Sequence, residues 1–158
     1  MKLLRYGPKG QERPGILDTQ GRIRDLANVV PDIAGDALLP EALQRLARQE
    51  IDKLPVVQGA PRIGPCVGKV GKFVCIGLNY ADHAAESNLP IPKEPIVFMK
   101  ATSAIIGPND EVEIPRKSQK TDWEVELGVV IGKPAKYVSE SAAMDHVARG
   151  LFHRPILT

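Results

Sequence analysis

The 158-residue chain is poor in cysteine, and Cys66 and Cys75 are its only two thiols. Disulfide frameworks are typical of small secreted domains that cannot build a core, whereas this chain is long enough to bury one. We therefore expect two reduced, mostly buried cysteines. Neither thiol has the neighbouring soft ligands, at the right spacing, that a zinc site would need.

Long apolar runs and an excess of one charge are also absent. No stretch reaches about 18 uninterrupted apolar residues, the length that a membrane-spanning helix needs. Arg5 and Gly7 interrupt the apolar start before it could form the core of a secretion signal. The 21 basic residues are balanced by 19 acidic ones, which leaves a formal charge of +2. This balance does not predict a basic surface that binds a polyanion. We expect a cytoplasmic protein that binds neither membranes nor nucleic acid.

Glycine and proline turns divide the beginning of the chain into short elements. Strand-like pieces at 2–6, 15–17 and 22–26 are separated by such turns, which predicts a small antiparallel meander. Leucine and alanine at three-to-four spacing then predict a helix over 41–52, with Pro40 in its first turn.

A connector over 58–71 is rich in glycine and proline. Such punctuation is typical of a segment between domains, and we place the boundary near residue 65. The sequence thus predicts a small N-terminal domain over 1–65 and a second domain over 66–158.

The second domain begins with a predicted strand, 73–77, that leads through Gly77 into an alanine-rich helical segment. His83 and Glu86 stand three residues apart there, on one helical face. A carboxylate beside an imidazole orients the ring and raises its pKa, which suits a base that must take a proton from water. The alternative is an exposed ion pair that stabilises the helix by about 0.2–0.5 kcal/mol. The His83–Glu86 pair lies just after a predicted strand, a common position for functional sites on α/β folds, which supports the functional interpretation.

Two further features lie downstream of this helix. Three prolines within 88–95 predict a loop, and 95–100 predicts a buried strand that ends at Lys100. A lysine at a strand end most often contacts solvent, yet beside acidic groups it could bind a substrate carboxylate. Both interpretations stay open.

A third pattern, Asp-Trp-Glu-Val-Glu-Leu-Gly-Val-Val-Ile-Gly, occupies 122–132. Its alternation predicts a strand in which Glu124 and Glu126 share one face, about 6.5 Å apart along the axis. Both precede the apolar run Val129–Ile131, where two unpaired like charges would cost stability unless a cation neutralised them. The pattern favours a metal site over a solvated strand face.

Taken together, three motifs in this order resemble the fumarylacetoacetate hydrolase family. They are the Gly-Leu-Asn-Tyr run at 77–80 with His83 and Glu86, the Phe-Met-Lys run at 98–100, and the acidic strand over 124–132. Three linked motifs are far more specific than any one of them.

Neighbouring runs refine the resemblance. Residues 99–110 and 120–123 are most similar to bacterial members described as ureidoglycolate lyase or 2,4-diketo-3-deoxy-fuconate hydrolase. The resemblance implies an α+β fold, in which a small N-terminal β-meander plus helix domain precedes an incomplete mixed β-roll. It also implies a homodimer or other self-association.

The resemblance implies a metal-dependent hydrolase or lyase that cleaves a C–C bond in a 2-oxo or diketo acid. In that picture His83, oriented by Glu86, is the base that activates water. Tyr80 and Lys100 bind the small-molecule oxo-acid substrate. The breaking bond leaves an enolate, which the metal stabilises.

Metal ligation in the same picture belongs to Glu124 and Glu126. The ion is Mg²⁺ or Mn²⁺, with Ca²⁺ as a further candidate, because hard cations prefer carboxylate oxygens. The family's third ligand is an aspartate beyond the helix predicted at 140–147, and 149–158 do not carry that pattern. We expect a chain truncated after about residue 148, with low metal affinity, poor activity and a tendency to self-associate.

Three alternatives accompany this interpretation. Decarboxylases and tautomerases of the same family begin with the same chelation step, so the motifs do not separate them from C–C hydrolases. The chain could also be a catalytically incompetent fragment that acts at most by pairing with an intact homologue. An unrelated α/β binding domain, in which the acids and the His83–Glu86 pair are solvated, is the third.

Overall fold

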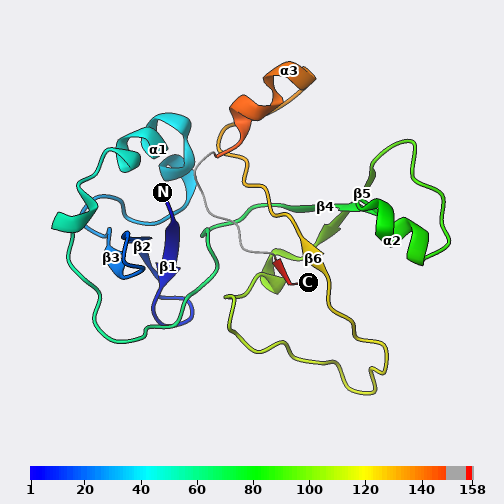
Figure 1. The fold of residues 1–158 in the computed structure, drawn as a ribbon, viewed down its shortest axis with the longest axis horizontal. Helices are drawn as coiled ribbons and strands as arrows, with labels where there is room; N and C mark the ends of the chain where they lie inside the picture. The colour runs from blue at the N-terminus through cyan, green and yellow to red at the C-terminus, as the bar shows by residue number, and fades with distance from the viewer. Residues whose placement is uncertain (149–155, 158) are drawn as a thin grey trace. The chain divides into compact units, whose positions relative to one another are not determined.

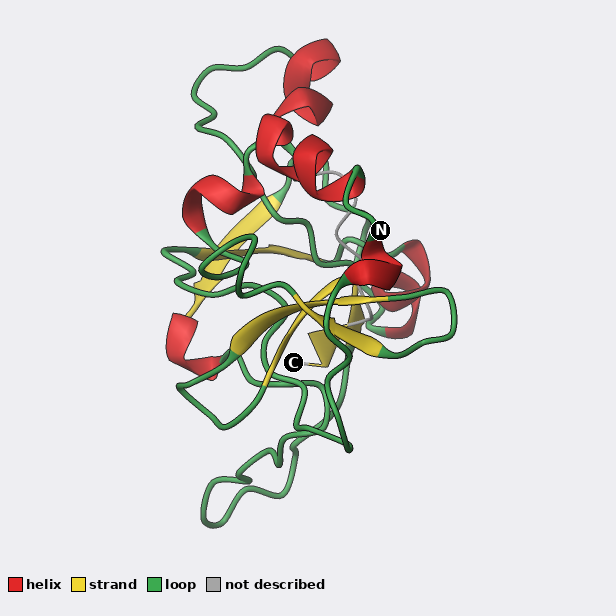
Figure 2. Ribbon diagram, turned by 90° about the vertical axis from the view of Figure 1, so that its left-hand side faces the viewer, coloured by secondary structure: helices red, strands yellow, loops and turns green. Residues whose placement is uncertain are grey.

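The computed structural model describes residues 1–148 and 156–157. Its elements are a mixture of short helices and strands (Figure 1), joined by long loops (Figure 2). Internal contacts group the chain into two compact units. The first unit comprises 1–69 with the described residues from 106 onward, and the second comprises 70–105.

The N-terminal part of the first unit is the predicted meander. Strands β1 (Leu3–Tyr6), β2 (Arg13–Leu17) and β3 (Ile23–Asp25) pair antiparallel in the order β1-β2-β3. In this register Leu3 lies opposite Ile16. Each strand finds its partner across a short turn, so the local sequence was sufficient to predict the pairing.

The predicted helix over 41–52 is shorter in the structure. A 3₁₀ turn, η1 (Gly35–Leu38), precedes α1 (Pro40–Ala47), and a second 3₁₀ turn, η2 (Ile51–Lys53), follows it. The position one turn beyond buried Leu46 is the exposed Glu50, so the apolar stripe that anchors the helix ends there. Helices in proteins depend mainly on such packing, which explains the early end.

The core of the first unit lies between the meander and α1. Segments far apart in sequence contribute to it, and Ala148 is among its buried members. The buried core residues are Leu3, Ile16, Leu26, Ile33, Leu38, Leu43, Leu46 and Ala148.

The C-terminal described segment packs onto this core. The helix predicted at 140–147 is shorter: α3 (Glu140–Ala143) follows Ser139 at its N-cap position and continues as the 3₁₀ turn η4 (Met144–His146). The Ala148 N–H donates to the carbonyl of Val130 at 2.8 Å. A Cβ on Gly132 would lie 2.5 Å from the backbone oxygen of Leu38, so a larger residue there would force the backbone apart.

The second unit is built on a two-stranded antiparallel sheet. Strands β4 (Phe73–Gly77) and β5 (Ile96–Lys100) pair with Phe73 opposite Lys100. Between them lies helix α2 (Ala81–Glu86), and the 3₁₀ turn η3 (Thr102–Ala104) follows β5. The predicted strands, helix and intervening loop are confirmed.

The expected burial of the strand over 95–100 is wrong. Val97 and Met99 are 63% and 61% exposed, and Phe98 on the opposite face is 43% exposed. The expectation came from an unbroken apolar run, which is typical of a strand covered on both faces. Within the described residues of this unit, no third strand extends the sheet.

The strand predicted over 122–132 is mostly irregular. Only β6 (Val125–Glu126) forms, and it pairs with β7 (Ile156–Leu157). Trp123 and Leu127 beside it are each 72% exposed. Alternation establishes which residues can share a face, but a strand forms only where a partner supplies hydrogen bonds.

The apolar run after this strand is also more exposed than expected. Val129 and Ile131 are 56% and 58% exposed, while Val130 between them packs against the core. The run therefore alternates in burial, as a segment covered on one side does. Residues 149–155 and 158, on which the predicted truncation depends, lie outside the described part.

The two thiols are free, in agreement with the expectation. Their expected burial is wrong, because Cys66 is exposed and Cys75 is only partly buried. Cys75 lies on β4, whose sheet is incompletely covered. In the described part of the chain, no helix has the length and apolar character needed to cross a membrane.

The compact units do not coincide with the predicted domains. The first break, after Lys69, falls close to the boundary predicted near residue 65, but the described residues from 106 onward group with the N-terminal part. The two units reflect contacts within this chain alone, whereas a domain boundary is defined by the contacts of the whole protein. The division into 1–65 and 66–158 remains a prediction.

Candidate functional site

Four of the predicted site residues lie in the second unit. The chain leaves β4 at Gly77 and passes through Leu78, whose φ of 49° lies in the left-handed region. It then reaches Tyr80, the N-cap of α2, which is 42% exposed. This tight exit from the strand starts the helix that carries His83, as the sequence pattern predicted.

Helix α2 presents its polar side chains outward. Ala84 is only 1% exposed and anchors the helix, while His83 and Glu86 are exposed. The backbone N–H of His83 donates to Oδ1 of Asp82 at 2.9 Å. The imidazole is thus accessible to a substrate or to water.

The described structure contains no hydrogen bond or ion pair between the side chains of His83 and Glu86. A spacing of three on a helix keeps the two groups within reach of each other. The orienting role of Glu86 therefore remains a prediction. Lys100, the last residue of β5, is partly exposed, so its ammonium group is available to a ligand.

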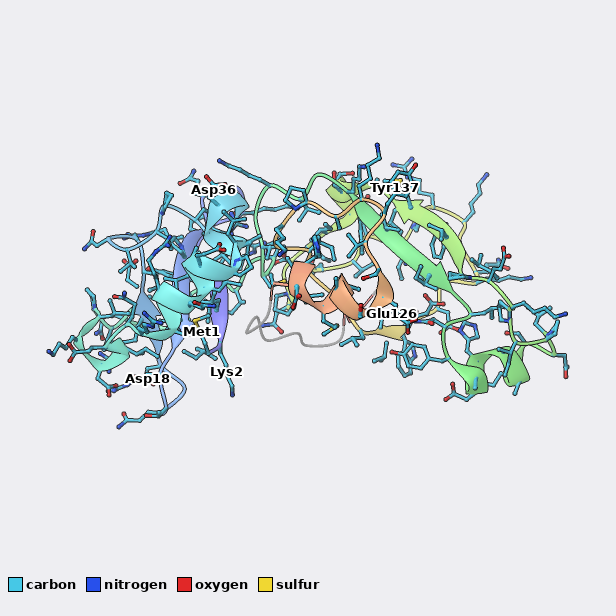
Figure 3. The ribbon with its side chains drawn as sticks, turned by 90° about the horizontal axis from the view of Figure 1, so that it is seen from above. Met1, Lys2, Asp18, Asp36, Glu126 and Tyr137 are labelled. Atoms are coloured by element: carbon cyan, nitrogen blue, oxygen red, sulfur yellow. The ribbon has the colours of Figure 1, made fainter. Side chains whose placement is uncertain are left out.

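The two predicted metal ligands belong to the first unit. Glu126 lies in β6 and is partly buried, and Glu124 immediately precedes the strand and is exposed. Figure 3 labels Glu126 on this segment. A separation of two residues on extended chain places both side chains on one side of it.

The chemistry of this pair fits a hard divalent cation, since both donors are carboxylates. The number of donors is small. Among residues 1–148, no three His, Cys, Asp or Glu side chains come together as a group that could hold a metal ion. Mg²⁺ keeps its own waters unless several protein oxygens replace them, so two carboxylates supply part of a site.

The structure thus groups Tyr80, His83, Glu86 and Lys100 in one compact unit and the acidic pair in the other. The convergence of the two groups on one substrate is a prediction from the motifs.

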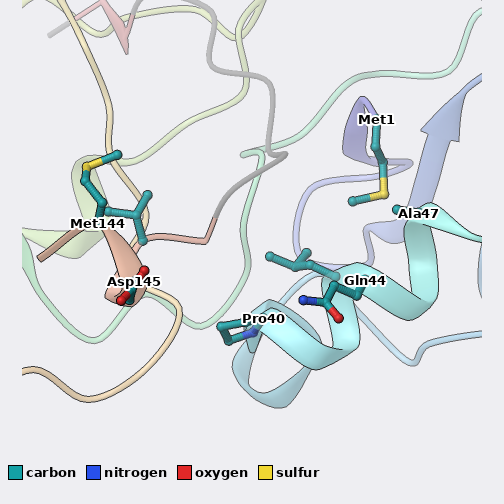
Figure 4. A pocket seen from close by; sticks show the side chains of 8 residues that line it. Met1, Pro40, Gln44, Ala47, Met144 and Asp145 are labelled. Carbon is teal, nitrogen blue, oxygen red and sulfur yellow. The ribbon is translucent and has the colours of Figure 1, made fainter. Parts of the chain in front are cut away.

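A pocket of about 400 Å³ lies elsewhere, beside α1 and η4 in the first unit (Figure 4). None of the predicted site residues lines it, and its walls are mainly apolar. Its lining residues are Met1, Pro40, Leu43, Gln44, Ala47, Met144, Asp145 and Val147.

The fold of this chain is similar to that of two solved structures. A fumarylacetoacetate hydrolase from the psychrophile Exiguobacterium antarcticum matches with a TM-score of 0.66 and 28% identity, over 92% of this chain and 52% of that one. A "putative HpcE protein" from Mycobacterium smegmatis matches with a TM-score of 0.67 and 30% identity, over 90% of this chain and 51% of that one. The fold is therefore of the fumarylacetoacetate hydrolase class.

Sequence comparison agrees with this class. The model of the fumarylacetoacetate (FAA) hydrolase C-terminal family matches residues 72–150. The chain belongs to this family. The matched segment contains His83, Glu86, Lys100 and the acidic pair, as the motif resemblance predicted.

Curated relatives are longer than this chain. A protein of Burkholderia multivorans named "Putative hydrolase" is 66% identical over 148 residues, which are 94% of this chain and 52% of the relative. The chain thus spans about half the length of the curated relatives it matches.

Proposed function

We propose that the chain carries part of the active site of a metal-dependent hydrolase or lyase that cleaves a C–C bond in a 2-oxo or diketo acid. The observation that carries the proposal is the family match over 72–150, which includes every residue of the three motifs up to Gly132. The hydrolase name of the curated relative supports the reaction type. Ureidoglycolate lyase-like and diketo-deoxy-sugar-acid hydrolase-like substrates are the finer form of this proposal.

In the proposed site His83 takes a proton from water, and its exposure on α2 leaves the ring open to solvent. Glu86 orients the imidazole. Lys100 provides a positive charge for a substrate carboxylate, and Tyr80 contacts the same substrate. A bound Mg²⁺ or Mn²⁺ would supply positive charge at the keto oxygen, and Glu124 and Glu126 are the residues that would hold it.

A second candidate is a catalytically incompetent fragment of such an enzyme. The incomplete donor set in the described residues and the exposed β4–β5 sheet favour it. In this case the motifs indicate the family alone, and catalysis requires either the longer protein or a dimer with an intact homologue.

Turnover of oxaloacetate and of an acylpyruvate, in the presence of Mn²⁺, distinguishes the two candidates. If this chain is an enzyme, His83→Gln should lower kcat about 10²–10⁴-fold, because general-base catalysis contributes on that order. His146→Gln is the matched control, since His146 lies outside the motifs and its Nδ1 contacts the carbonyl of Pro134. Absence of turnover in a folded wild-type chain would favour the second candidate, the incompetent fragment.

A further inference from the structure

A cluster of charged side chains joins segments that are far apart in the sequence. Arg62 donates from Nε to Oδ1 of Asp110 at 2.6 Å and from Nη2 to Oδ2 at 2.5 Å. Its Nη1 also donates to Oε1 of Glu12 at 2.8 Å and to the carbonyl of Gly7 at 3.2 Å. One guanidinium thus holds two carboxylates and a backbone oxygen.

The cluster is largely shielded from water. The side chain of Glu12 is 6% exposed, that of Asp110 is 16% exposed, and that of Arg62 is 25% exposed. Hydrogen bonds from Arg62 lower the pKa of Asp110 to about 2 and also hold the pKa of Glu12 below its ordinary value. Carboxylates in such surroundings require a cationic partner.

Backbone hydrogen bonds join the segment around Arg62 to the meander. The Gly7 N–H donates to the carbonyl of Arg62 at 2.9 Å, and the Gly64 N–H donates to the carbonyl of Arg5 at 2.8 Å. A Cβ on Gly64 would lie 2.6 Å from Cγ of Glu12. The segment at 62–64 therefore lies directly against the meander.

The segment at 62–64 also contacts the turn at 107–110. The Gly107 N–H donates to Oδ2 of Asp110 at 2.7 Å, and the Asp110 N–H donates to the carbonyl of Gly107 at 3.1 Å. A Cβ on Gly107 would lie 2.2 Å from the backbone oxygen of Ile63. The turn thus closes on Asp110, whose carboxylate is held by Arg62.

We propose that Arg62 is a latch that docks the turn at 107–110 onto the N-terminal meander. The turn lies in the chain between Lys100 and Glu124, two residues of the proposed site, and Arg62 lies on the connector before the family domain. Loss of the guanidinium frees the turn and leaves the meander folded, because β1 and β2 pair through their own backbone and Glu12 keeps a second cation, Arg5, at 3.7 Å.

Hydrogen exchange of the wild-type chain and of Arg62→Met, followed at single amides, tests this latch. In Arg62→Met the amides of Gly107 and Asp110 should exchange at least about tenfold faster, while amides in the β1–β2 ladder stay within about twofold of wild type. Arg62→Lys should fall between, since an ammonium cannot form the two parallel bonds. The control is Arg13→Met, which removes an exposed ion pair to Asp25 and should leave the turn unchanged.

Unchanged exchange at Gly107 and Asp110 in Arg62→Met would overturn the latch. An equal loss of protection in turn and ladder would also overturn it, because it would show that Arg62 stabilises the whole unit. If Arg62→Met does not fold, Arg62→Lys provides the same comparison. Faster exchange in that variant that is confined to the turn supports the latch, and any other pattern contradicts it.

Discussion

The carboxylate of Asp18 lies inside the meander with only 1% of its side chain exposed. It accepts hydrogen bonds from the backbone N–H groups of Gln20 and Arg22, and from the side chains of Arg22 and Arg24. Burial alone would raise the pKa of Asp18. The hydrogen bonds to its charged form outweigh burial and hold the pKa far below the ordinary value of 3.8.

The sign of the resulting pH dependence follows from this shift. The folded-state pKa of Asp18 is lower than its unfolded-state pKa, so its contribution to stability is fully present above about pH 4 and declines as pH falls toward the folded pKa. Asp18→Asn should therefore lower the free energy of unfolding most at neutral pH. The difference from wild type should shrink in acid.

Urea unfolding from pH 7 down to pH 2 measures this difference, with Asp36→Asn at an exposed position as the control. A difference between wild type and Asp18→Asn that stays constant over this range would contradict the assigned charge state.

Local sequence patterns predicted the elements that carry the candidate residues His83 and Lys100, because each pattern lies within one short segment. His83 follows the strand exit at Gly77, and Lys100 ends its strand, as predicted. The cluster around Arg62 gave no such signal. Its partners lie 48 and 50 residues away, and only the fold shows which of many charged residues they are.

Among the elements, the β4–β5 sheet is the one whose burial differs most from the burial that its sequence predicts. Its apolar run was expected to be buried, yet side chains on both of its faces are exposed. Periodicity predicts that a strand forms, whereas burial depends on which other elements cover it. The same limit explains why only β6 forms within 122–132, where the ladder requires a distant partner.

We predict that this exposed sheet promotes self-association, because paired strands with open edges and apolar faces bind other chains. The double variant Val97→Lys with Met99→Lys should raise the concentration at which dimers or larger species form by about tenfold or more. Size-exclusion chromatography with light scattering over a dilution series gives that concentration.

The control for this variant is Tyr137→Lys, which changes a side chain that is 97% exposed and whose ring lies beneath the ammonium group of the neighbouring Lys136. Equal association of wild type and the Val97→Lys, Met99→Lys variant would show that another surface is responsible. Monomeric wild type at every concentration would contradict the prediction outright.

For the whole molecule, family and fold class agree between sequence and structure. The motif resemblance named the family that matches 72–150, and the solved structures confirm the class. The domain boundaries, the cytoplasmic location, the oligomeric state and the convergence of His83 with the acidic pair remain predictions. The boundaries, the oligomeric state and the convergence depend on contacts within or between chains, which local patterns do not encode, and the location depends on cellular sorting.

The proposed function depends most on Glu124 and Glu126 holding a divalent metal ion. Titration of the chain with Mn²⁺, followed by electron paramagnetic resonance of the free ion, tests it most directly. Wild type should bind one ion with a dissociation constant on the order of millimolar, because two carboxylates supply few oxygens. The double variant Glu124→Ala with Glu126→Ala should lose this binding, and exposed Glu113→Ala should retain it. Binding that is absent in wild type, or equal in all three proteins, would contradict the claim.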